Sequence, residues 1–401
     1  MLLTFEQARR VVEEHARSVA KPASERVELL QAGGRVLAEK IVADRDLPPF
    51  PRAARDGFAV RAQDVAAVPF SLKVVAEIRA GMDVSGIRVG AGECAEIMTG
   101  AAAPQGSDAI VMVEYTSRNG SDVQVQRGVV AGENVVPRGS EARSGAELVR
   151  PGMRLTPAAI AAAASVGMSQ LRVCRKPRVA ILSTGDEIVG VRAEPLGHQI
   201  RNSNTYSLAA QVVKAGGAPW ALPVAPDEQE RLRQLIVQGL QADLLLMTGG
   251  VSMGKYDLVE VVLKGLGAEF FFTGARIQPG KPVVFGRVGK KYFFGLPGNP
   301  VSTMVTFELF AQAMMEALSG AELQPLRFLH AELKREIKAK TGLTRFLPAA
   351  LSGEFGNTEV ELVSWQGSGD IAATSRANCF AVIPPDREII PAGEWVAVLP
   401  V

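Results

Sequence analysis

Three turn-rich segments combine glycines with side chains that can bind a phosphate group or a metal ion. They are TGDE (184–187), TGGVSMGKYD (248–257) and LPGNPVS (296–302). Glycine lets the backbone approach a ligand closely, so that the N–H groups of a turn can point at an anion. The carboxylates of Asp186, Glu187 and Asp257 are the hard oxygen ligands that divalent cations prefer. The segments predict a phosphate or metal-phosphate site if the fold brings them together.

Each segment follows a short apolar stretch that is typical of a buried strand. Strands are expected at 177–184, 242–248 and 291–295, and helical patterns occupy 202–217, 227–240 and 299–318. Strands that alternate with helices at this spacing predict βαβ units and a mostly parallel sheet. In such a sheet the carboxyl ends of the strands share one edge, where ligands bind. The helix expected from Asn299 adds an N-terminus, which favours negative charge.

The turn after the second strand partly matches a nucleotide-binding P-loop. Gly249, Gly254 and Lys255 have the right spacing, but the next position is Tyr256, where the P-loop needs serine or threonine to hold Mg²⁺. The sequence also lacks the G-x-G-x-x-G fingerprint of dinucleotide-binding folds and the G-x-S-x-G elbow of hydrolases. These differences argue against an NTPase, a nicotinamide-dependent enzyme and a serine hydrolase.

The flanking regions are predicted to form separate domains. Helical patterns begin at Thr4, in a T-x-x-Q capping box, and at Thr156, whereas short alternating strands punctuated by glycine fill 69–145. Short strands also fill the chain from Leu326 onward. We therefore predict a helical and extended N-terminal domain (1–45 and 147–176), an inserted β-rich domain (46–146), an α/β domain (177–325) and a C-terminal β domain (326–401).

Composition excludes several classes of protein. The chain has 401 residues, and 44 Lys and Arg against 42 Asp and Glu leave a net charge of +2, which is no basic footprint for nucleic acid. The three cysteines and three histidines are scattered, which argues against a disulfide framework or a zinc site. The N-terminus is unlike a signal peptide and the apolar runs are too short to cross a bilayer, so we expect a cytoplasmic protein without membrane contact.

The segment DLPPFPRAARDGF (46–58) has two interpretations. Its prolines stiffen the chain and Asp56-Gly57 makes a turn, so taken alone it is more simply a rigid linker between domains. Met98-Thr99-Gly100 and QPGKP (278–282) are likewise, taken alone, ordinary loops.

Taken together, eight segments in order resemble one family, the molybdopterin molybdenumtransferases, called MoeA in bacteria and represented in eukaryotes by the E domain of gephyrin-like proteins. They span nearly the whole chain. The segments are DLPPFPRAARDGFAV (46–60), IMTGA (97–101), LSTGDEIV (182–189), RNSN (201–204), TGGVSMGKYD (248–257), QPGKPVVFG (278–286), GLPGNPVS (295–302) and TSRANCFAVIP (374–384).

The resemblance implies an elongated homodimer with four domains. The central one is a three-layer α/β domain similar to molybdopterin-binding proteins, and the last is a small β-barrel. It also implies the reaction. Adenylylated molybdopterin is bound, AMP is released, and molybdate enters the dithiolene to form the molybdenum cofactor, assisted by Mg²⁺ or a similar divalent cation. A transient contact with a molybdopterin adenylyltransferase, which supplies the substrate, is implied as well.

The family's motifs also imply roles for residues of this chain. The expected catalytic residues are Asp56, Glu187 and Thr99. The expected metal ligands are Asp186, Glu187, Asp257 and Asp56. The expected phosphate-binding residues are Thr184, Gly185, Gly249, Gly250, Ser252, Gly298 and Asn299. The expected molybdate-binding residues are Lys281, Ser302, Arg345 and Ser375.

The chain departs from the family's pattern at three places. Gln278 stands where many relatives have Lys or Met, Glu141 replaces an aspartate, and a customary R-x-E-F-x-R reads LTRFLP (343–348), which leaves Arg345 as the nearby cation.

The altered arginines motivate one alternative, a scaffold protein that kept the fold. A second alternative is a molybdopterin adenylyltransferase, which the central domain alone resembles, although the segments 46–60 and 374–384 argue against it.

Overall fold

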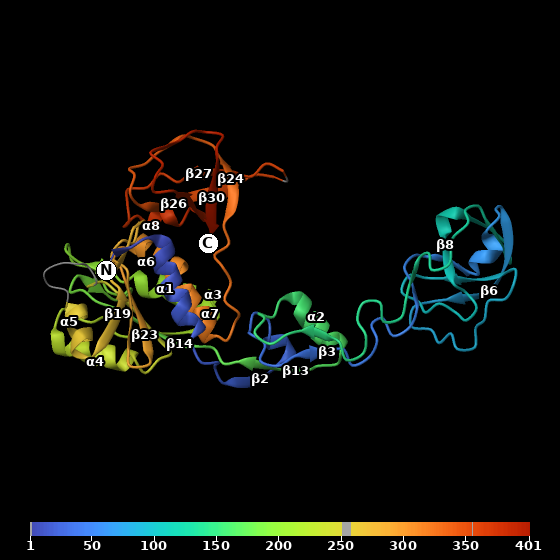
Figure 1. The fold of residues 1–401 in the computed structure, drawn as a ribbon, viewed down its shortest axis with the longest axis horizontal. Coiled ribbons are helices and arrows are strands. Elements are labelled where there is room, and N and C mark those ends of the chain that lie inside the picture. The colour runs from blue at the N-terminus through green and yellow to red at the C-terminus, as the bar shows by residue number, and fades with distance from the viewer. Residues whose placement is uncertain (1, 251–257, 355) are drawn as a thin grey trace.

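The computed structural model describes residues 2–250, 258–354 and 356–401. The molecule is elongated (Figure 1). An α/β domain with a β-barrel beside it forms one end, a slender extended region forms the middle, and a β-rich domain forms the far end. The three-layer α/β domain, the β-rich insert and the barrel agree with the predicted fold class.

The central domain is built on a six-stranded sheet whose first four strands are parallel. The inner strand β18 (Leu244–Thr248) is a continuous buried run because helices cover both faces, as in other parallel sheets. The last two strands are antiparallel and complete the edge. In sheet order the strands are β17 (Ala218–Ala221), β14 (Arg178–Ser183), β18 (Leu244–Thr248), β23 (Lys291–Leu296), β22 (Val284–Val288) and β19 (Ala268–Phe272).

Alternate residues of β14 enter two separate cores, as the pleat of a strand requires. Val179 and Ile181 pack with one set of helices, whereas Ala180 and Leu182 pack with the other. The first set is α3 (Asn204–Lys214), α6 (Pro300–Thr306), a π-helical turn (Phe307–Ala311), α7 (Gln312–Leu318) and α1 (Phe5–Arg17). The second set is α4 (Gln229–Gly239) and α5 (Leu258–Gly265).

Helix α1 begins with the predicted capping box, in which Thr4 and Gln7 exchange side-chain and backbone hydrogen bonds. We placed residues 1–45 in the N-terminal domain, but α1 packs on the central domain. Its buried Ala8, Val12 and Ala16 face α7 and the π-helical turn. The apolar stripe of α1 therefore completes the core beside α7. Strand β1 (Leu2–Leu3) also pairs within the central domain, with β20 (Gly274–Ala275).

The extended middle region is held together by two antiparallel strand pairs and one short helix. Leu37, Ile41, Ala163 and Leu171 are among its fully buried residues. Because the chain passes through this region twice, it forms an arm that carries the insert (Figure 1). The pairs are β2 (Ser24–Glu28) with β13 (Gln170–Cys174) and β3 (Ile41–Val42) with β12 (Glu147–Val149), and the helices are α2 (Pro157–Ser165) and a 3-10 turn (Leu29–Gln31).

The insert forms a six-stranded sheet whose strand β5 (Gly57–Val60) is buried on both faces. Phe58 and Val60 enter one core, and Ala59 between them enters the other. In sheet order the strands are β8 (Ala109–Met112), β5 (Gly57–Val60), β7 (Glu93–Ile97), β6 (Phe70–Ile78), β10 (Asp122–Val125) and β9 (Thr116–Asn119). The rest of the insert consists of one strand pair, two 3-10 turns and loops. The pair is β4 (Arg52–Ala53) with β11 (Val135–Val136), and the turns are Ala62–Val65 and Val113–Tyr115.

The C-terminal domain is a closed barrel, because β26 pairs with strands at both ends of the sheet order. Its longest strand, β26, was not predicted as a strand from the sequence. Strand β21 (Ile277–Gln278) of the central domain joins the barrel beside β26. The barrel strands are β26 (Thr344–Ser352), β27 (Glu359–Leu362), β24 (Leu329–Leu333), β30 (Trp395–Pro400) and β28 (Cys379–Ile383), with β25 (Ile337–Lys338) and β29 (Ile389–Ile390) as a separate pair and α8 (Ile371–Thr374) as a short helix.

Candidate functional site

The three predicted turns meet in one cleft at the carboxyl ends of β14, β18 and β23. The cleft has a volume of about 720 Å³, within the range of small-molecule sites. These strands are neighbours in the sheet, so the turns that follow them lie side by side. The predicted phosphate-binding residues that line it are Thr184, Gly185, Gly249, Gly250, Gly298 and Asn299. Ser252 lies outside the described residues.

Two glycines allow the turns to pack this closely. Gly249 has φ +89°, and a Cβ atom there would lie 2.3 Å from the carbonyl oxygen of Thr184. Gly185 has φ +138°, and a Cβ atom there would lie 2.5 Å from Oε2 of Glu187. Glu187 thus folds back over its own turn at the edge of the cleft.

A buried amide ties the floor of the cleft together. The Nδ2 atom of Asn204 donates to Oγ1 of Thr248 at 2.9 Å and to the carbonyl oxygen of Gly298 at 2.7 Å. Its Oδ1 atom, and Oγ1 of Thr184, are buried without a hydrogen-bond partner among the residues that the structure describes. Both residues line the cleft, where unpaired polar atoms are costly unless a ligand or water bonds to them.

Asp186, Glu187 and Asp227 supply negative charge at one side of the cleft. Oδ1 of Asp186 accepts the backbone N–H of Asp227 at 3.0 Å. Burial raises the pKa of Asp227 above its usual range, and the negative charges of Asp186 and Glu187 raise it further. Within 2–250, 258–354 and 356–401, no three His, Cys, Asp or Glu side chains are grouped as a metal site. The predicted ligand Asp257 lies in the undescribed stretch.

Asp227 was missed from the sequence. The signal that could have found it is its position, a few residues after β17, at the same edge of the sheet as the three turns. The segment RNSN (201–204) was noted only as a family motif, and no role was given to Asn204, whose amide crosses between the turns.

Asp56 and Thr99 form a separate site on the insert. Oδ1 of Asp56 accepts the backbone N–H of Thr99 at 2.6 Å and its hydroxyl at 2.8 Å. These bonds, that of the N–H first, lower the pKa of Asp56, which is fully exposed and therefore remains a carboxylate. Thr99 thus orients the carboxylate while leaving its other oxygen open to solvent.

A single chain does not bring Asp56 and Thr99 to Glu187. We expected all three to share one cleft, but the insert lies at the far end of the arm from the central sheet (Figure 1). The reason is topological, since the insert is attached only through the paired strands of the extended arm. Asp56 is therefore absent from the cleft of its own chain, and its role as a metal ligand stays a prediction.

The four predicted molybdate residues lie on elements that meet where the central domain contacts the barrel. Ser302 is buried on α6, Arg345 lies on β26 opposite Gln278 of β21, and the exposed Ser375 follows α8. Helix α8 packs against both α6 and β26. Lys281 is exposed, and its neighbour Pro282 lines the cleft.

The junction is tied by hydrogen bonds from the third turn to the barrel domain. Nδ2 of Asn299 donates to Oγ of Ser368 at 2.7 Å, and the N–H of Val301 donates to the carbonyl oxygen of Ser368 at 3.0 Å. Arg345 is only 7% exposed, its Nη1 donates to the carbonyl oxygen of Leu343 at 3.2 Å, and burial lowers its pKa. Arg345 is therefore a buried cation close to the cleft.

Comparison with known proteins identifies the family of the chain. Three family models match: "MoeA N-terminal region (domain I and II)" over residues 3–167, "Probable molybdopterin binding domain" over 180–317 and "MoeA C-terminal region (domain IV)" over 330–401. The chain is 36% identical over 387 residues to a molybdopterin molybdenumtransferase of Synechococcus elongatus, which covers 94% of each chain. It is 34% identical to that of Bacillus subtilis, covering 91% of this chain and 87% of the relative.

Solved structures agree over the full length. The moeA protein of Pyrococcus horikoshii OT3, a molybdopterin biosynthesis protein, superposes with a TM-score of 0.80 at 29% identity and covers 100% of both chains. The fold and the cleft thus define a multidomain protein built around a molybdopterin-binding type of α/β domain. The chain belongs to the molybdopterin molybdenumtransferase family. The predicted family is confirmed.

None of the helices in the part of the chain that the structure describes is long and apolar enough to cross a membrane.

Proposed function

We propose that this protein inserts molybdate into adenylylated molybdopterin and releases AMP, forming the molybdenum cofactor. The main support is the cleft at the ends of β14, β18 and β23, with its glycine-rich turns and with polar atoms of Thr184 and Asn204 that have no hydrogen-bond partner among the described residues. The adjoining junction holds the buried cation Arg345 and the exposed Lys281, which suit a tetrahedral dianion. The curated relatives are named molybdopterin molybdenumtransferases, which supports the transfer of molybdenum to molybdopterin.

The chain has two chemical roles in this proposal. It holds the phosphates of the substrate, and it activates the attacking water. The phosphoanhydride breaks, water adds to phosphorus, and AMP leaves. Turn N–H groups and the hydroxyl of Thr184 hold the phosphates, while a carboxylate takes the proton of the attacking water. Asp56 suits the role of base, because its oriented, exposed carboxylate stays ionised.

The role proposed for Asp56 requires a second copy of the chain. The arm holds the insert far from its own cleft (Figure 1), while a twofold arrangement can place it over the cleft of a partner. We therefore propose a homodimer with two composite sites. Each site takes Asp56 and Thr99 from one protomer and the turns from the other.

We propose Mg²⁺ or a similar divalent cation beside Glu187 and Asp186. Three carboxylates support this proposal: Glu187 and Asp227 line the same cleft, and Oδ1 of Asp186 accepts the backbone N–H of Asp227 at 3.0 Å. When bound, the cation would neutralise phosphate charge, with waters and phosphate oxygens completing its ligands.

Saturating Mg²⁺ is expected to lower the pKa of Asp227, because a nearby dication favours its charged form. Carbon-detected NMR titration of the side-chain carboxyl with and without Mg²⁺ would measure the shift. Asp83 is a matched control on the insert, since its lowered pKa arises from hydrogen bonds of Ser85 and should not move. An Asp227 titration identical with and without Mg²⁺ would rule out the ion at this place.

The proposed reaction is tested by incubating the purified protein with adenylylated molybdopterin, Mg²⁺ and molybdate. AMP and a cofactor that activates a molybdenum apoenzyme are expected products. Consumption of ATP with plain molybdopterin would show an adenylyltransferase instead. Binding of substrate without AMP release would favour the scaffold function.

A further inference from the structure

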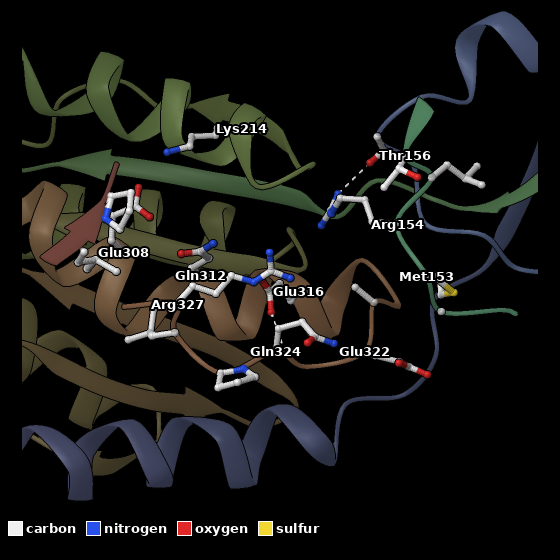
Figure 2. A pocket seen from close by; sticks show the side chains of 18 of the residues that line it. Met153, Arg154, Thr156, Lys214, Glu308, Gln312, Glu316, Glu322, Gln324 and Arg327 are labelled. Atoms are coloured by element: carbon white, nitrogen blue, oxygen red, sulfur yellow. Dashed lines mark hydrogen bonds between the residues drawn. The ribbon is translucent and has the colours of Figure 1, made fainter. Parts of the chain in front are cut away.

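A second cavity lies where the extended arm meets the central domain. Its volume is about 740 Å³, and it shares no lining residue with the cleft. Its walls come from the end of the arm (150–156), the C-terminal end of α3, helix α7, the connection 321–329 and the end of β30. Figure 2 shows the side chains entering it from these different elements. No step of the proposed reaction uses it.

Cations outnumber carboxylates in the walls of this cavity. Five cations stand against three carboxylates, which leaves a net charge of +2 when Arg9, Arg150, Arg154, Lys214 and Arg327 are set against Glu308, Glu316 and Glu322. Part of this charge is already neutralised. Arg150 pairs with Glu322 at 2.7 Å, and Arg9 pairs with Glu13 at 2.8 Å.

The remaining cations have no carboxylate partner in the described ranges 2–250, 258–354 and 356–401. There, Arg154 donates to the carbonyl oxygens of Gly34, at 2.9 Å, and Ala215, at 3.3 Å. Among the residues described here, Lys214 and Arg327 form no ion pair and no side-chain hydrogen bond. Both are exposed at the cavity, so a ligand can reach them.

Glu316 is a carboxylate of this cavity. Burial raises its pKa, and the charges of Arg9, Arg154 and Arg327 act in the opposite direction. Because Arg9 and Arg150 are already paired, the three cations Arg154, Lys214 and Arg327 stand against two carboxylates, Glu308 and Glu316. The cavity therefore keeps an excess of positive charge on three separate elements.

We propose that this cavity binds a compact oxyanion with two or more negative charges, held by Arg154, Lys214 and Arg327. The class covers di- and tricarboxylates and inorganic phosphates. The volume suits a small molecule, and charge-assisted hydrogen bonds to guanidinium and ammonium groups provide the recognition. The three cations come from the arm, the central domain and the connection to the barrel, so a bound anion would tie these units together.

Isothermal titration of the full chain with citrate, and separately with inorganic pyrophosphate, tests the proposal. One of the two probes is expected to bind saturably at one site per chain. Lys214→Gln and Arg327→Gln should each weaken binding about tenfold or more, since each removes a charge-assisted contact. The two probes distinguish a carboxylate ligand from a phosphate ligand.

Lys264→Gln is the matched control. Lys264 also lies in the last turn of a helix on this sheet, but it does not line the cavity. Its replacement should leave probe binding unchanged. Thermal unfolding of every variant checks that the fold is intact.

Four results would overturn the proposal. The first three are the absence of saturable binding by either probe, an affinity of the double variant Lys214→Gln/Arg327→Gln equal to that of the wild type, and loss of binding in Thr184→Val alone, which would locate the probe in the cleft. A change in sedimentation of the double variant without any probe effect would assign the cations to a contact between copies, and would overturn it too.

Discussion

Asp56→Asn is expected to lower AMP release by about 10³-fold, the usual effect of losing a general base. The substitution keeps an oxygen that can accept both hydrogen bonds of Thr99, so the turn should keep its shape. Asp56 is fully exposed, and the thermal unfolding midpoint should therefore stay near that of the wild type. Release of AMP measured by chromatography, with binding of substrate as a second readout, separates loss of chemistry from loss of affinity.

A mixing experiment extends this result to the proposed dimer. Glu187→Gln should also be inactive, because it alters the cleft. When the two inactive variants are mixed and allowed to exchange subunits, about half of the dimers combine one of each. Such a dimer has one intact composite site of two, so about a quarter of wild-type activity should return.

Activity that stays at the level of the separate variants after verified subunit exchange would contradict the composite site. The matched control is a mixture of Asp56→Asn with Thr99→Val. Both changes lie on the insert, so no intact composite site can form in that mixture.

Gly249→Ala is expected to destabilise the fold by about 3 kcal/mol, from the strain of a positive φ and from steric overlap. The new Cβ would meet the carbonyl oxygen of Thr184 at 2.3 Å, so the turn must move away from its neighbour. A displacement of about 1 Å at this turn should reduce activity about 10²-fold. Chemical denaturation and AMP release measure the two effects.

Gly289→Ala provides the control for backbone strain. Gly289 also has a positive φ, +57°, in the turn between β22 and β23, but no atom lies within 4 Å of the added Cβ. The Gly289→Ala substitution should lower the free energy of unfolding by about 1 kcal/mol and leave activity unchanged. If the two variants proved equally stable and equally active, close packing of the turns would not shape the cleft.

The helices and strands of the central domain could be predicted because local signals there are strong. The continuous apolar run of β18 reads as a strand covered on both faces, and Thr4 and Gln7 fix the start of α1. The rule that parallel strands share a carboxyl edge then located the phosphate-binding turns without any contact information.

The barrel was harder to predict. Strand β26 contains Pro348, which disfavours a central strand, and its side chains are buried almost continuously, so no alternation marks it. Strand β27 is close to it in sequence, but its other two partners are distant: β28 begins at Cys379, and β21 belongs to the central domain. The opposition of Gln278 and Arg345 follows from that pairing, and no local pattern encodes it.

The sequence by itself determined the family, the order of domains and the turns that build the cleft, because these depend on short segments whose residue types act locally. Only the tertiary structure decided where the insert lies. Asp56 and Thr99 meet each other through a close contact, yet the arm carries them away from Glu187. The distance between two sites on different domains is set by the packing of the region that joins them, and that packing has no signature at either site.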